Sequence, residues 1–120
     1  MQRSKLLFVI AALLLSGLVP ILGQAHAKLT ATQPADGDLV AAPDRLSLEF
    51  DGALHLTGIA IVSVSGERQE LANLPEAAGT RFDLDIPGRL SPGEYYVVWK
   101  GTAADSHFST GEFFFTITGD

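Results

Sequence analysis

A histidine near the start of the chain could offer a metal ion two nitrogen ligands at once. His26 follows residues 1–25, which have the features of a secretory signal peptide. Cleavage after Ala25 would make His26 the first residue of the mature protein. A terminal histidine carries both an α-amine and an imidazole, and together these groups can chelate a transition metal. We therefore expect metal chemistry at His26 if the chain is cut at that bond.

Asp105 and His107 form a second pair of candidate ligands, far along the chain. Residues two apart in an extended segment face the same side, so this carboxylate and this imidazole could converge on one ion. With His26, the set would supply three nitrogens and one oxygen, which suits tetragonal Cu(II). Imidazole also suits zinc and nickel, and an Asp-x-His pair is more often an ordinary solvated turn. The residues alone leave these alternatives open.

The segment that precedes His26 predicts export. Arg3 and Lys5 form a short positive region before the apolar run 6–15, and Gly23 and Ala25 are small residues at the −3 and −1 positions of a cleavage site. We expect a signal peptide over residues 1–25 and a periplasmic protein. An uncleaved anchor is the alternative, although the apolar run is short for a membrane span.

A second cleavage position competes with the first. Ala25-His26-Ala27 is itself a good small-x-small site. A cut after Ala27 would discard His26 and with it half of the candidate ligand set.

The composition of the predicted mature chain narrows its partners. Residues 26–120 make one small domain of 95 residues without cysteine, so disulfides and thiolate metal sites are excluded. The sole methionine, Met1, leaves with the signal peptide, which excludes a thioether site for Cu(I). The formal charge of −6 becomes −8 once Arg3 and Lys5 are removed. Such an acidic domain should repel nucleic acid and anionic lipid.

Short runs of alternating hydrophobicity, separated by turn residues, predict an all-β domain. We expect seven strands in an antiparallel, immunoglobulin-like Greek-key β-sandwich or barrel. Trp99, Phe113 and Phe115 should face the core, whereas Phe114 and His55 should face outward. The predicted strands lie in residues 28–32, 46–50, 59–64, 70–74, 81–86, 94–101 and 108–118.

Several stretches of the chain, in the same order, resemble the CopC family of periplasmic copper-resistance proteins. The start of the mature chain is similar to the family's H-A-x-L and P-A-D-G motifs, and the later stretches resemble L-x-P-G-x-Y-x-V-x-W, A-D-G-H and S-G-x-F-x-F. The matching residues are 26–29, 33–37, 42–50, 90–99, 104–107 and 109–115.

The resemblance implies one Cu(II) per chain, with His26, Asp105 and His107 as ligands. It also implies a protein that sequesters copper or hands it to a CopD-like inner-membrane protein. We expect a monomer. Three departures from the family pattern matter. Gly52 occupies the position of an acid found in some members, so Asp51, one residue earlier, is only a weak candidate ligand. Ser106 replaces a glycine, and the mature chain lacks the methionine-rich loop of a Cu(I) site.

Two other classes of function compete with copper binding for transport. A terminal histidine that clasps copper with a second histidine resembles the copper brace of lytic polysaccharide monooxygenases, which are oxidative enzymes. An acidic ligand such as Asp105 argues for storage or transport instead, so we expect no enzyme activity. A metal-free interaction module would result if cleavage removed His26.

Overall fold

The computed structural model describes residues 27–119, so the predicted signal peptide and His26 lie outside the described residues. The described part is all-β, as predicted, with no helix between residues 27 and 119 and hence none that could span a membrane. Its strands are β1 (Leu29–Gln33), β2 (Leu39–Val40), β3 (Arg45–Ser63), β4 (Arg68–Glu70), β5 (Gly79–Asp85), β6 (Gly93–Ala103) and β7 (Phe108–Ile117).

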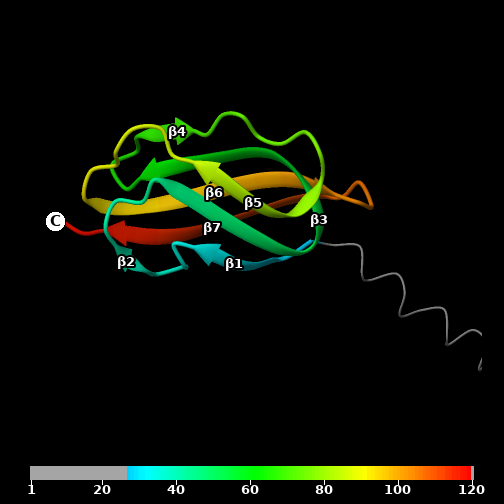
Figure 1. Cartoon of the computed structure of the whole chain (residues 1–120), viewed down its shortest axis with the longest axis horizontal. Helices are drawn as coiled ribbons and strands as arrows, with labels where there is room; N and C mark the ends of the chain where they lie inside the picture. The colour runs from blue at the N-terminus through cyan, green and yellow to red at the C-terminus, as the bar shows by residue number, and fades with distance from the viewer. Residues whose placement is uncertain (1–26, 120) are drawn as a thin grey trace, which may run out of the picture.

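The seven strands form a curled sheet in the order β1-β3-β6-β7-β2, with β4 and β5 also paired to β3 (Figure 1). The first half of β3 pairs with β1 and β5, and its second half pairs with β4 and β6. The long β6–β7 ladder completes the second layer. Apolar side chains from both layers fill the space between them, as in a β-sandwich.

The continuity of β3 corrects one prediction. Residues 46–50 and 59–64 were expected as two strands, but both belong to one strand of 19 residues. Its pairing register shifts between Glu49 and Leu54, where the strand passes from one layer to the other. A second shift, between Leu56 and Gly58, is a bulge that changes which residues face inward.

The short strand β2 corrects another prediction. It was not expected, and it pairs with β7 in parallel, so the sheet is not purely antiparallel. Because one predicted pair of strands is a single strand and β2 is additional, the observed number of strands is still seven.

The hydrophobic core confirms the predicted orientation of the aromatic residues. Trp99, Phe113 and Phe115 are buried, whereas Phe114 is exposed on the opposite face of β7. The Trp99 ring meets Phe50 edge to face, with 5.0 Å between ring centroids. These contacts join the β6–β7 ladder to the first half of β3.

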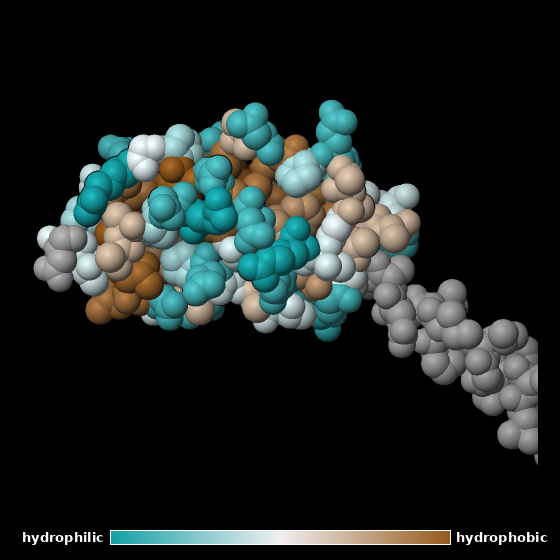
Figure 2. Space-filling model, in the orientation of Figure 1, coloured by the Kyte–Doolittle hydropathy of each residue, from teal (hydrophilic) through white to brown (hydrophobic). Residues whose placement is uncertain are grey.

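A polar face covers the outside of the layer formed by β5 and the first half of β3. Figure 2 shows hydrophilic side chains gathered over this face. Here the Ser47 hydroxyl donates a hydrogen bond of 2.6 Å to Asp83, and Arg81 bonds both Asp83 and Glu49. The Ser47 bond, followed by the bond from Arg81, holds the pKa of Asp83 below its usual value.

Candidate metal centre

One end of the molecule brings together three segments that are distant in sequence. The described chain begins at this end, where the bend of β3 and the loop between β6 and β7 also lie (Figure 1). Leu54, just after the bend, pairs with Ala103, the last residue of β6. The predicted ligands Asp105 and His107 lie two and four residues after Ala103.

The loop between β6 and β7 holds Asp105 and His107 against each other. One carboxylate oxygen of Asp105, Oδ2, lies 2.5 Å from Nδ1 of the His107 ring. The other, Oδ1, accepts a hydrogen bond of 3.0 Å from the His107 backbone N–H. The side chain of Asp105 is 20% exposed and that of His107 is 67% exposed. The carboxylate is thus partly covered and the imidazole is open to solvent. The two side chains meet in a turn, and not along the extended segment that the sequence analysis assumed.

Backbone hydrogen bonds fix the shape of this loop. Ser106 N–H donates to the carbonyl of Ala103, and Ala103 N–H donates to the carbonyl of His107, each at 3.0 Å. Ser106 has a φ of 68°, in the left-handed region. A turn followed by a left-handed residue is a common three-residue hairpin loop. The family pattern has glycine at this position, and glycine adopts positive φ without strain. In this chain Ser106 adopts the same region with a side chain.

The segment just after His26 is tied to the bend of β3. The backbone N–H of Lys28 donates a hydrogen bond of 2.7 Å to Oδ1 of Asp51. In return, the N–H of Asp51 donates to the carbonyl of Lys28 at 2.9 Å. Ala27 is buried and belongs to the hydrophobic core. Sequence reasoning missed this contact of Asp51, because no local pattern joins residues 23 positions apart.

Within residues 27–119, no three His, Cys, Asp or Glu side chains group closely enough to hold a metal ion. The structure therefore brings together two of the predicted ligands, Asp105 and His107, and does not add Asp51 to them. The third predicted ligand, His26, lies outside the described residues. His55 is exposed on β3, as predicted.

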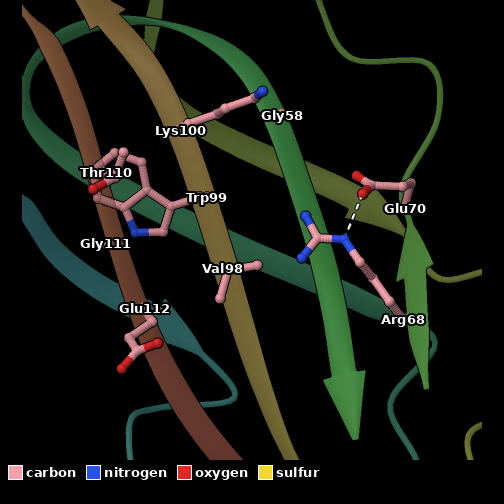
Figure 3. A pocket seen from close by; sticks show the side chains of 9 residues that line it. All are labelled: Gly58, Arg68, Glu70, Val98, Trp99, Lys100, Thr110, Gly111 and Glu112. Atoms are coloured by element: carbon pink, nitrogen blue, oxygen red, sulfur yellow. Dashed lines mark hydrogen bonds and ion pairs between the residues drawn. The ribbon is translucent and has the colours of Figure 1, made fainter. Parts of the chain in front are cut away.

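A surface groove of about 490 Å³ lies elsewhere, on the outer face of β4, β3, β6 and β7 (Figure 3). Arg68 and Glu70 pair on one side of it, and Lys100 lies across Gly58. None of Asp51, Asp105 and His107 lines this groove, so it is separate from the candidate metal centre. Its lining residues are Gly58, Arg68, Glu70, Val98, Trp99, Lys100, Thr110, Gly111 and Glu112.

This β-sandwich, with an Asp-x-His turn at the end where its first strand begins, agrees with a known class of domain. The family model described as "CopC domain" matches residues 29–118. Since the match covers most of the chain, the protein belongs to the CopC family.

Relatives and solved structures agree with that assignment. The chain is 30% identical over 119 residues to "Copper resistance protein C" of Escherichia coli, covering 88% of this chain and 94% of the relative. It is also 30% identical over 112 residues to "Protein YobA" of E. coli K12, covering 88% and 90%. The crystal structure of PcoC, a methionine-rich copper resistance protein from E. coli, superposes on this chain with a TM-score of 0.63 at 27% identity. That match covers 78% of this chain and all of PcoC.

Proposed function

We propose that the mature protein is an exported Cu(II)-binding protein of the periplasm. It would sequester copper or deliver it to a CopD-like inner-membrane importer. The observation that carries this proposal is the convergence of Asp105 and His107 at the end of the sandwich where the described chain begins. Membership of a family whose relatives are named for copper resistance supports the choice of metal.

The proposed ligands are the α-amine and ring of His26, the carboxylate of Asp105 and the imidazole of His107. Three nitrogens and one oxygen suit Cu(II) better than the oxygen-rich sites of calcium or magnesium. The amine and both imidazoles must be unprotonated to bind, so affinity should fall as the pH falls. We expect one Cu(II) per chain, bound by a monomer.

The contact between Asp105 and His107 bears on how these groups would bind. The two nitrogens of an imidazole point away from each other, so one carboxylate cannot hold Nδ1 and also share a metal with Nε2 of that ring. In this proposal the 2.5 Å contact orients the ring in the metal-free protein and is replaced when copper binds.

The position of Ala27 supports cleavage after Ala25. Ala27 is 6% exposed and packs in the core, so a cut after Ala27 would remove a core side chain as well as His26. Burying one methyl group contributes about 1 kcal/mol to stability. Cleavage after Ala25 keeps this contribution and leaves His26 at the terminus.

Mass spectrometry of the exported protein tests whether the proposed site can exist. The expected mass is that of residues 26–120, with one equivalent of Cu(II) bound after titration and desalting. A mature chain that begins at Lys28 would lack two of the four donor atoms and would contradict the proposal. Peroxide formation by the reduced copper protein, at the rate of a copper-brace enzyme, would instead favour an oxidative function.

A further inference from the structure

The outer face of the layer formed by β4, β6, β7 and the second half of β3 exposes apolar side chains to solvent. Tyr96 and Phe114 are cross-strand partners on β6 and β7, and they are 42% and 44% exposed. Their rings lie 6.2 Å apart. Val98 on β6 and Val62 on β3 are half-buried and continue the apolar surface. Exposed apolar surface with a polar rim is typical of a protein–protein contact.

This face has an aromatic half and a hollow half. Tyr96 and Phe114 make up the aromatic half. The hollow half is the groove of about 490 Å³ described above, which includes Val98 and Glu112, the next outward residues of the same two strands (Figure 3). Two of the lining residues are glycines, so part of the groove is bounded by backbone. A surface that carries both the rings and a hollow for rings can fit a second copy of itself.

One row of paired residues separates the two halves. Val97 pairs with Ile61 of β3 and with Phe113 of β7, and Ile61 pairs in turn with Gln69 of β4. A two-fold axis parallel to this row would reverse the strands of a second copy and place the same strands opposite each other. The aromatic half of each copy would then lie against the groove of the other.

The charged residues of this face follow the same symmetry. On β6, Glu94 and Lys100 lie three residues before and three residues after Val97. On β4, Arg68 and Glu70 lie on either side of the same row. The two-fold axis would therefore place Glu94 opposite Lys100 of the second copy, and Arg68 opposite its Glu70. Neither Glu94 nor Lys100 forms an ion pair within residues 27–119, so both charges are available to a second copy.

The size of this face fits a weak and reversible contact. Strands spaced about 4.8 Å apart, with a rise of about 3.3 Å per residue, give roughly 450 Å² for four strands over residues 94–100 and their partners. Two such faces bury about 900 Å² in total, at the low end for specific interfaces. The protein should therefore be a monomer when dilute and associate as its concentration rises.

We propose that two copies of the protein associate face to face through this surface as a symmetric dimer. The sheets pack with their strands antiparallel and nearly aligned, as the two layers of a sandwich do. Tyr96 of each copy lies against Val98 of the other, and two Glu94–Lys100 pairs close the ends. The contact goes beyond the proposed function, and it uses neither Asp105 nor His107.

Charge reversal and its rescue test the two-fold geometry. The metal-free mature protein is studied by sedimentation equilibrium between about 10 µM and 1 mM. A salt concentration of about 0.15 M screens the repulsion between acidic copies beyond about 8 Å. The variants are Glu94→Lys, Lys100→Glu and the double exchange, which restores the net charge of the parent. Asp44→Lys is the matched control, since it makes the same change of charge at an exposed residue that precedes β3.

We expect the parent to dimerise with a dissociation constant of about 0.1 mM. Each single reversal should weaken the dimer at least about tenfold, because like charges then face each other at two symmetric positions. The double exchange should return to within about threefold of the parent, since opposite charges meet again. Asp44→Lys should not weaken association. Amide NMR shifts should change with concentration along residues 94–100 and 110–116 and stay constant along β5.

Four results would overturn the dimer. They are a parent that stays monomeric at the highest concentration, assembly beyond two copies, association that both single reversals leave unchanged, and a double exchange that fails to restore it. Concentration-dependent shifts confined to β5 would also contradict the proposal. Because the protein is metal-free, none of these results depends on whether copper binds.

Discussion

Ser106 places a side chain between the two candidate ligands, at a φ of 68°. A residue with a Cβ is strained in the left-handed region, and the cost is about 1 kcal/mol relative to a right-handed conformation. The hairpin loop keeps this conformation because the hydrogen bonds of Ala103 fix the turn. The relative positions of Asp105 and His107 therefore depend on a backbone that glycine would adopt more easily.

Substituting Ser106 by glycine should stabilise the protein. The left-handed strain is relieved, and part of the gain is lost to the greater freedom of glycine in the unfolded chain, which leaves about 0.5–1 kcal/mol. Urea unfolding of the metal-free protein measures the change. Ser109→Gly, within β7, is the matched control and should destabilise, because glycine weakens a strand interior. A lower stability for Ser106→Gly would show that the serine side chain makes a contact worth more than the strain.

The contact between Asp105 and His107 could be anticipated from their spacing of two residues, but the two side chains meet in a turn with Ser106 at positive φ and not in an extended segment. The hydrogen bonds between Asp51 and Lys28 could not be predicted in this way. They join residues 23 positions apart in the sequence. The outer groove was also missed, since its lining comes from residues of four strands that no local sequence pattern joins.

In strand β3, simple alternation of hydrophobic residues predicts the inward-facing side chains only up to the bulge. Leu54 and Leu56 face inward and His55 faces outward, in agreement with simple alternation. The bulge between Leu56 and Gly58 then inserts a residue, so Ile59 and Ile61 are buried although their parity is opposite. A change of parity resembles a new strand, which is why two strands were predicted. The two residues of β2 are too few to show an alternating pattern. They form a strand because they pair with β7.

The pairing of β3 with β5 makes a prediction about acid titration. Asp83 should titrate below the usual pKa of an aspartate, because the Ser47 hydroxyl and the Arg81 guanidinium both stabilise its charged form. Its contribution to stability should be present above the ordinary pKa and disappear as the pH falls through the lowered one. Carboxyl chemical shifts measured by NMR against pH report this titration. Ser47→Ala should raise the pKa of Asp83, and Ser109→Ala on β7 should leave it unchanged. An Asp83 that titrates normally in the parent would contradict the assigned hydrogen bonds.

For the whole molecule, the all-β class could be predicted from the sequence. Seven alternating runs separated by turn residues are local features that are typical of β-strands. The curl of the sheet, the parallel edge and the meeting of three segments at one end arise from long-range pairing. The family assignment agrees with the overall architecture. The proposed copper binding depends on cleavage of the signal peptide after Ala25, because it requires His26 at the terminus.

Copper should therefore stabilise only the correctly cleaved protein. At a free Cu(II) concentration one hundred times Kd, binding to the folded state alone adds about 2.7 kcal/mol to the unfolding free energy. A protein whose terminal α-amine is acetylated loses that amine as a chelating partner of the ring and should gain much less. Thermal unfolding with and without Cu(II) measures both proteins. Equal stabilisation of the two chains would show that the terminal amine is not a ligand.

Electron paramagnetic resonance of the Cu(II)-loaded mature protein tests the central claim most directly. The account predicts one tetragonal Cu(II) per chain, with hyperfine coupling to nitrogen. His26→Ala and His107→Ala should each change that spectrum and weaken binding by about 100-fold or more, since even supporting residues of metal ligands contribute 10–100-fold. His55→Ala, an exposed histidine on β3, should leave the spectrum unchanged. An oxygen-only signal, or a spectrum that neither His26→Ala nor His107→Ala alters, would contradict the account.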